Sequence, residues 1–128
     1  MKLLLDTCTA LWIATEDPRL SARAREAFTD PSNEVHLSSV SVWEIALKHL
    51  VGRLELRRSP ERIVAELHEQ YRVTPLPLDS EAALQTAKLP QLHRDPFDRA
   101  LVAQAIIEGL VLLTPDEVLH RYPARTLW

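Results

Sequence analysis

The sequence predicts an α/β protein in which a parallel β-sheet lies between layers of helices. Short apolar runs typical of strands alternate with segments of helical periodicity, and parallel strands require such helical crossovers. Residues 110–113 are apolar at every position, as expected of a strand buried on both faces of a sheet. The chain has 128 residues, 46% of them hydrophobic and 26% charged, so we expect one compact domain over residues 1–128.

The first half of the chain contains two predicted strands and four predicted helices. The strands are Lys2–Leu5 and Val35–Leu37. The helices are a segment through Leu11, Trp12 and Ile13, residues 21–28 with Ser21 as the cap, residues 41–50, and a segment that Ser59 and Pro60 open and that runs to about Tyr71. Serine before a helix and proline at its first position both favour helix initiation.

The second half continues the alternation. Residues 73–78 carry two prolines and are predicted to be extended, but not a central strand. The remaining predictions are a helix capped by Asp79 or Ser80 that runs to about Lys88, a helix from Asp95 and Pro96 to about Glu108 that Gly109 ends, a strand at 110–113, a helical turn after Thr114, and a short edge strand near Trp128.

Four acidic residues lie near the predicted helix starts: Asp6, Glu44, Asp98 and Asp116. Each has a local structural explanation. Glu44 has capping-box spacing from Ser41 and also lies four residues before Lys48, with which it can pair. The other three acids lie in strand-to-helix turns or first helical turns, where the helix dipole favours negative charge.

The joint placement of these acids favours a functional site. Asp98 lies on a largely apolar stripe with Leu101, Val102 and Ala105. Burying a charged carboxylate on such a stripe costs free energy unless a cation pairs with it. In an open parallel sheet, ligands bind beyond the carboxyl ends of the strands, where we expect the four acids to gather. Clustered carboxylates repel unless a cation neutralises them, and oxygen-only ligands favour Mg²⁺ or Mn²⁺ over Zn²⁺.

Composition argues against several other classes of protein. The formal net charge of -3 disfavours a protein that coats nucleic acid through bulk electrostatics. No segment approaches the ~20 apolar residues of a membrane-spanning helix, and Cys8 is the only cysteine, so we expect a cytoplasmic protein without an internal disulfide. The five histidines form no close pair in the sequence that predicts zinc, and no glycine-rich phosphate loop is present.

Several stretches resemble the PIN-domain nucleases, and within them the VapC-type toxins of bacterial toxin–antitoxin pairs. The matching stretches are LLLDTCTALW, SVWEIALK, HRDPFDRALVAQA and LLTPD, in an order and separation that agree across nearly the whole chain. The resemblance implies a three-layer α/β/α sandwich around a central parallel sheet. It also implies a divalent-metal-dependent endoribonuclease that uses Mg²⁺, with Mn²⁺ as a substitute, and that acts as the toxin of a VapBC-type pair.

The same resemblance assigns roles to individual residues. Asp6, Glu44 and Asp98 match the core acids of the family, and Asp116 matches the more variable fourth acid, although Pro115 stands where the family often has a small residue. Asp95 is then a helix cap first and a ligand second. Arg99 either orients Asp95 or contacts phosphate. The resemblance further implies an RNA substrate, a cognate antitoxin that occupies the acidic site, and a homodimer.

These roles lead to a mechanistic hypothesis. Asp6 and Asp98 hold a magnesium ion directly, and Glu44 and Asp116 bind it through water or hold a second ion. The hydroxyl groups of Thr7 and Thr114 either contact the site or cap helices.

Three alternatives remain to be weighed against this hypothesis. An aspartate-nucleophile phosphohydrolase requires a second aspartate two residues after Asp6, where this chain has Cys8. A receiver-like domain requires a lysine after a suitable strand, and none of the three lysines qualifies. A catalytically degenerate PIN domain that only binds RNA or a partner is the main non-enzymatic alternative.

Trp12, Trp43 and Trp128 can serve an interface, although core packing is expected for the first two.

Overall fold

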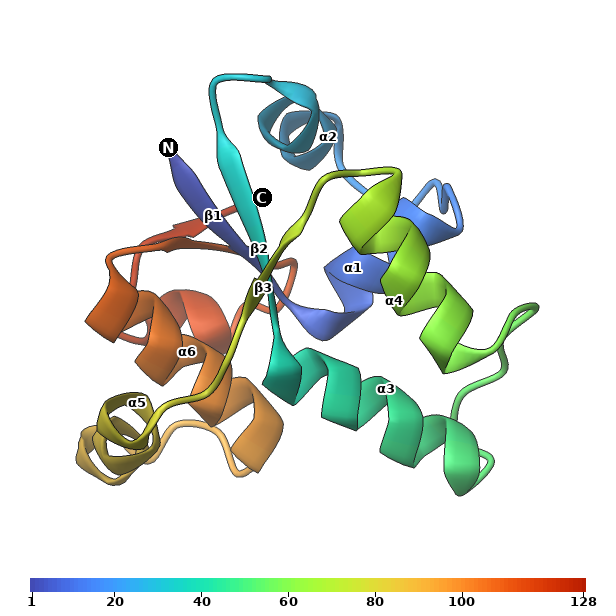
Figure 1. The fold of residues 1–128 in the computed structure, drawn as a ribbon. Coiled ribbons are helices and arrows are strands. Elements are labelled where there is room, and N and C mark those ends of the chain that lie inside the picture. Colours follow the sequence, from blue (N-terminus) through green and yellow to red (C-terminus); the bar gives the residue numbers. More distant parts are fainter.

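A five-stranded, fully parallel sheet forms the centre of the protein in the computed structural model, which describes residues 1–128 (Figure 1). The strand order is β3-β2-β1-β4-β5, and every neighbouring pair is parallel. The strands are β1 (Lys2–Leu5), β2 (Glu34–Ser38), β3 (Thr74–Leu76), β4 (Val111–Leu113) and β5 (Thr126–Leu127). The predicted α/β class with a central parallel sheet is confirmed.

Six α-helices and two short 3₁₀ helices connect the strands. They are α1 (Thr7–Ala14), α2 (Ala22–Thr29), α3 (Ser39–Leu50), α4 (Pro60–Glu69), α5 (Ser80–Gln85), η1 (Thr86–Lys88), α6 (Pro96–Glu108) and η2 (Leu119–Arg121). Every α-helix follows a serine or an aspartate whose side-chain oxygen accepts a backbone N–H two or three residues later. This capping satisfies N–H groups that have no partner within the helix. Gly109 ends α6 in the left-handed conformation, as predicted.

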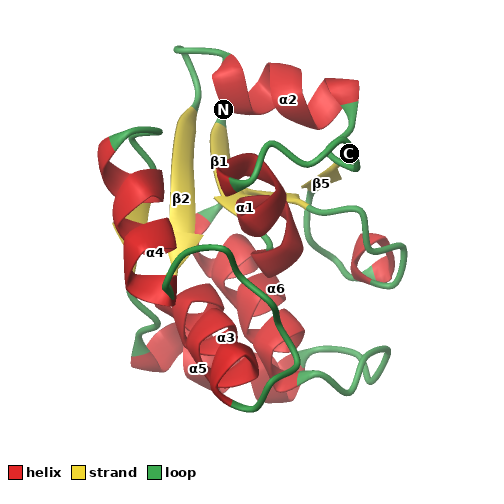
Figure 2. Cartoon of the chain, turned by 90° about the vertical axis from the view of Figure 1, so that its right-hand side faces the viewer, coloured by secondary structure: helices red, strands yellow, loops and turns green.

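The two faces of the sheet bury separate apolar clusters, as alternation along a strand requires. Leu3 and Leu5 of β1 pack in one cluster with residues of α1, α2 and α4. Leu4 points to the opposite face and packs with residues of α6 and with Leu112 of β4. Figure 1 shows α1, α2 and α4 on one side of the strands and α5 and α6 on the other, and Figure 2 shows the same molecule turned by 90°. The carboxyl ends of β1 and β2 lead directly into α1 and α3.

The predicted start of α3 is wrong by two residues. The helix begins at Ser39, and Ser38 caps it by accepting the N–H of Val40 at 3.0 Å. The sequence offers several serines that can act as the cap, and Ser38 takes this position because it also donates to the buried Gln104 of α6 at 2.5 Å. Glu44 therefore lies beyond the first turn and forms no capping box with Ser41.

Three other features differ from or refine the predictions. Residues 74–76 form an edge strand, where Pro75 is tolerated because no neighbour requires its missing N–H on the outer side. The helical turn after Thr114 is a 3₁₀ helix that starts only at Leu119. The expectation of core packing is wrong for Trp43, which is 61% exposed and contacts Phe97 edge-on at 4.8 Å between ring centroids.

No helix combines the length and apolar character needed to cross a bilayer.

Candidate active site

The four predicted acids lie together at the carboxyl end of the sheet. Asp6 directly follows β1, and Asp116 follows β4 after Thr114 and Pro115. These two strand ends are adjacent because β1 and β4 pair in parallel, and the Asp6 backbone N–H donates to the Leu113 carbonyl at 3.2 Å. Glu44 projects from the second turn of α3, which follows β2, and Asp98 from the first turn of α6.

Asp6 is held by several hydrogen bonds and is only 4% exposed. Its Oδ1 accepts the backbone N–H of Thr9 and the thiol of Cys8, both at 3.0 Å. Its Oδ2 accepts the hydroxyl of Thr114. The Thr114 hydroxyl oxygen in turn accepts the backbone N–H of Asp116 at 3.1 Å, so one threonine orients the start of the Asp116 turn and the Asp6 side chain together. Burial beside Asp6 raises the pKa of the Cys8 thiol, so Cys8 stays a protonated hydrogen-bond donor.

Glu44 has one hydroxyl partner and one cationic partner. The Thr7 hydroxyl donates to Glu44 Oε1 at 2.5 Å and lies 3.1 Å from Ser41 Oγ. Lys48, one turn further along α3, forms an ion pair with Glu44 Oε2, as the sequence predicted. Burial opposes the charge on Lys48, but the hydrogen bond with Glu44 and the nearby acids raise the pKa of the ammonium. Both threonine hydroxyls that the sequence placed near the site therefore contact carboxylates.

Asp98 and Asp116 share a third neighbour, His93, which the sequence analysis did not select. His93 Nε2 lies 3.1 Å from Asp98 Oδ2 and 3.6 Å from Asp116 Oδ2. One potential ligand atom from each of the three residues lies within 4.8 Å of the others. Asp116 thus approaches Asp98 despite the preceding Pro115. The sequence signal for His93 is its place in HRDPFD, five residues before Asp98, but it has no second histidine close by in the sequence.

Asp98 carries the clearest electrostatic sign of a cation site. Burial first, and then the negative charges of Asp95, Glu44, Asp6 and Asp116, together raise the pKa of Asp98 to about 8. Carboxylates that share a pocket hold a proton unless a cation replaces it. Perturbation by burial together with specific neighbouring charges is characteristic of functional sites.

Asp95 and Arg99 have structural partners. Asp95 caps α6 by accepting the N–H of Phe97 at 2.9 Å. Arg99 Nη1 donates to the Pro90 carbonyl at 2.8 Å, and its Nη2 donates to the Thr86 carbonyl at 2.7 Å. No ion pair joins Arg99 to Asp95, so the guanidinium anchors the chain before α6.

The residues present fit a hard divalent cation. All four acids offer carboxylate oxygens, which suit Mg²⁺ or Mn²⁺ better than Zn²⁺. Lys48 is the only lysine or arginine that forms an ion pair with any of them. One ammonium group offsets only one of several negative charges. The cluster therefore has both the ligand chemistry and the unbalanced charge of a metal site.

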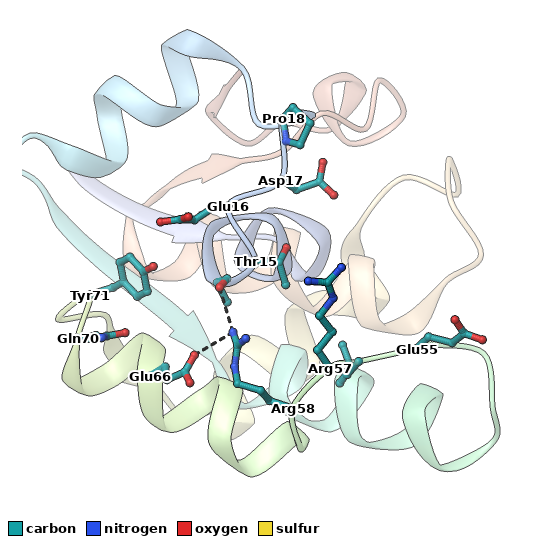
Figure 3. Close-up of a pocket in the computed structure, with 12 residues that line it drawn as sticks. Thr15, Glu16, Asp17, Pro18, Glu55, Arg57, Arg58, Glu66, Gln70 and Tyr71 are labelled. Atoms are coloured by element: carbon teal, nitrogen blue, oxygen red, sulfur yellow. Dashed lines mark hydrogen bonds and ion pairs between the residues drawn. The ribbon is translucent and has the colours of Figure 1, made fainter.

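A cleft of about 680 Å³ lies elsewhere, beside the carboxyl end of α1 (Figure 3). None of the four acids lines this cleft. Arg58 spans it by donating through Nη2 to the Ala14 carbonyl at 3.1 Å and by pairing with Glu66 at 3.0 Å. On the rim, Arg19 pairs with Asp17 at 2.8 Å. The cleft has the volume of a ligand site, but Arg58, which spans it, is already paired with Glu66.

Comparisons with known proteins identify the family and the fold. Residues 3–125 match the family model described as the PIN domain. The chain is 33% identical over 132 residues to Ribonuclease VapC22 of Mycobacterium tuberculosis, with 98% of each chain covered. Its fold resembles a crystal structure of VapBC2 from Rickettsia felis bound to a promoter DNA fragment, with a TM-score of 0.75, 15% identity and coverage of 99% of this chain and 98% of the other. DNA-bound VapBC from Salmonella typhimurium gives a TM-score of 0.66 at 24% identity, with 99% and 97% covered.

Proposed function

The chain belongs to the PIN-domain family, and on that basis we propose that it is a magnesium-dependent endoribonuclease, the toxin of a VapBC-type toxin–antitoxin pair. The observation that carries the proposal is the gathering of four acids at one end of the sheet with a single lysine partner, because clustered carboxylates bind either a proton or a cation. The 33% identity to a relative named as a ribonuclease supports the reaction class. We further propose that residues 1–128 act as one PIN domain.

In this proposal the four acids bind the cation in two different ways. Asp98 and Asp6 are the direct ligands, and Glu44 and Asp116 bind through water or hold a second ion. When bound, the metal supplies positive charge that stabilises the phosphate oxygens and makes coordinated water more acidic. Hydrogen bonds to Asp6 from Thr114, Cys8 and the N-terminus of α1 hold its carboxylate in one orientation. Oriented ligands favour productive geometry because less freedom is lost when the substrate binds.

A catalytically degenerate domain that only binds RNA or a protein is the competing proposal. This alternative predicts that the acids no longer bind a divalent cation. The presence of all four acids, together with the neighbours that orient them, supports the enzyme instead.

We also propose a cognate antitoxin and a homodimer as protein partners. Apolar side chains on α3 support a protein interface: Trp43, Leu47, Leu50 and Val51 are between 38% and 81% exposed. Their spacing of three to four residues places them on one side of the helix. An arginine from the antitoxin is chemically suited to the acidic cluster, because a guanidinium pairs with two carboxylate oxygens.

The test of this function is cleavage of total cellular RNA by the purified chain in magnesium or in chelator. We expect fragments only with magnesium, and we expect them to disappear in Asp6→Asn and Asp98→Asn. Retention of cleavage in both variants would indicate a contaminating nuclease. If the wild-type chain retains RNA on a filter without cutting it, the binding-only alternative replaces the enzyme. Size-exclusion chromatography of the chain, alone and co-expressed with a candidate antitoxin, tests the partner proposals.

A further inference from the structure

His93 differs from the other neighbours of the acids because it lies in a loop whose position is fixed by contacts outside the acidic cluster. The loop connects η1 to α6, and the histidine ring reaches both Asp98 and Asp116. Each of the other acids has its own donor: Thr114 for Asp6, Thr7 and Lys48 for Glu44, and the backbone N–H of Val118 for Asp116. For Asp98, His93 is the only polar neighbour within hydrogen-bonding distance.

The hydrogen-bond partner on the other side of the ring defines the tautomer of His93. Nδ1 lies 3.2 Å from the backbone nitrogen of Asp95, whose N–H donates to it. A nitrogen that accepts an N–H presents its lone pair, so the ring hydrogen of a neutral imidazole lies on Nε2. That hydrogen is on the side of Asp98. A metal bound through Nε2 would require the hydrogen on Nδ1, where it would oppose the Asp95 N–H.

Buried contacts hold the backbone of His93 in place. The backbone N–H of His93 donates to the phenol oxygen of Tyr122 at 2.8 Å, and Tyr122 is 4% exposed. Arg99 Nη1 donates to the same phenol oxygen at 3.2 Å and also binds the Pro90 carbonyl. The ring is therefore positioned by a network that involves none of the four acids directly.

We propose that His93 is a positioning residue that donates its Nε2 hydrogen to Asp98 and aligns this carboxylate for the metal, without ligating the ion itself. The inference rests on the proposed metal-dependent function, which it deepens. Residues that orient metal ligands typically contribute a factor of about 10 to 100 in metal affinity or activity. Tyr122 and Arg99 then act one step further away, because they fix the loop that carries the ring.

Three substitutions at position 93 separate a donor from a ligand. The side-chain amide of glutamine places an N–H near the position of Nε2, whereas asparagine is one carbon shorter and alanine has no donor. We expect His93→Ala and His93→Asn to weaken Mg²⁺ binding about 10- to 100-fold in calorimetric titration at pH 8. We expect His93→Gln to remain within about threefold of the wild type, because the contributions of single hydrogen bonds vary by such factors. Tyr122→Phe should give a smaller loss than His93→Ala.

Cleavage kinetics and a matched histidine complete the test. In His93→Ala, kcat at subsaturating magnesium should fall while the KM for RNA changes little, and excess magnesium should recover much of the loss. His49→Ala serves as the control, since His49 is exposed on α3 and contacts only the Leu54 carbonyl. Circular dichroism and thermal unfolding verify that each variant folds.

Two results would overturn the inference. If all four variants at positions 93 and 122 bind magnesium as tightly as the wild type, His93 has no role in positioning the metal ligand. A loss in His93→Gln as large as that in His93→Ala would make the ring itself a ligand. Ring nitrogen chemical shifts of the metal-free protein test the Nε2 tautomer without metal or RNA. A wild-type chain that shows this tautomer and binds magnesium more tightly than His93→Ala, but cuts no RNA, would therefore refute the nuclease proposal and leave the role of His93 intact.

Discussion

Two carboxylates of the cleft in Figure 3, Asp17 and Glu66, differ in their cationic partners from the carboxylates at the carboxyl end of the sheet. Around the cleft, Asp17 pairs with Arg19 and Glu66 pairs with Arg58. At the end of the sheet, five carboxyl groups influence one another, and a single ammonium group pairs with one of them. The two regions lie at opposite ends of α1, a helix of eight residues, which corresponds to about 12 Å.

The pKa shifts of the two regions have opposite signs. Hydrogen bonds from the side chain and backbone of Arg19 lower the pKa of Asp17 to about 2. Burial, followed by repulsion from the other acids, raises the pKa of Asp98 to about 8. A high density of acids therefore does not by itself define a site. What distinguishes the site is that the chain supplies too few cations of its own, so that a cation from solution completes it.

Replacing one glutamate in each region gives the largest expected contrast. Glu44→Gln should lower magnesium-dependent RNA cleavage by more than about 100-fold, because it removes an oxygen ligand and frees Lys48 beside the cluster. Glu66→Gln, the matched change at the cleft, should leave cleavage unchanged. Initial rates with a defined RNA measure both. Equal losses in the two variants would remove the functional distinction between the regions.

Magnesium should stabilise the folded protein through the sheet-end cluster alone. At a free concentration about 100-fold above its dissociation constant, a ligand that binds only the folded state adds about 2.7 kcal/mol to the free energy of unfolding. We expect this gain, seen as a higher Tm in differential scanning calorimetry, in the wild type and in Asp17→Asn. Asp98→Asn should lose most of it. An undiminished shift in Asp98→Asn would place the ion elsewhere.

The pH dependence of stability should separate the regions without any metal. Asp98 has a pKa of about 8 in the folded state, above the ordinary aspartate value of 3.8. Between about pH 4 and 8 the folded state therefore retains a proton that the unfolded state has released. Stability of the metal-free protein should therefore fall as pH rises through this window, and less steeply in Asp98→Asn. The lowered pKa of Asp17 acts in the opposite sense, with stability lost only as pH falls from 3.8 towards about 2.

Urea unfolding at pH 5 and pH 8 measures the effect of Asp98. A wild type and an Asp98→Asn variant with the same change in unfolding free energy between these values would contradict the assignment of the proton to Asp98.

The smallest expected effect concerns the internal ion pair of the cleft. Arg58→Ala should destabilise the fold by about 1 kcal/mol, because Arg58 joins the end of α1 to Glu66 of α4 and both side chains are partly buried. Cleavage of RNA by the isolated chain should not change. Chemical denaturation and the same cleavage assay measure the two quantities. Loss of cleavage without loss of stability would turn the cleft into a part of the active region.

The sequence predicted the parallel sheet and the gathering place of the acids because both depend on local patterns. Apolar runs such as 110–113 and the alternating helices leave few possible topologies, and right-handed crossovers bring the strand ends to one edge. Asp6 and Asp116 follow two such runs directly, and the order of strands then makes them neighbours. The start of α3 was missed because the choice among Ser38, Ser39 and Ser41 depends on Gln104, which lies 66 residues away from Ser38.

By itself the sequence determined the alternation of strands and helices and most of the helix caps, and it singled out the four acids as candidates, because these follow from short-range spacing and side-chain chemistry. The spacing of Glu44 and Lys48 also predicted their ion pair, but only the tertiary structure decided which distant residues contact the acids. The contacts of Thr7 with Glu44, of Thr114 with Asp6 and of Trp43 with Phe97 join residues more than 30 positions apart. Such contacts depend on how the layers pack, and the proton affinity of Asp98 depends on the same packing through burial and the distances to its neighbours.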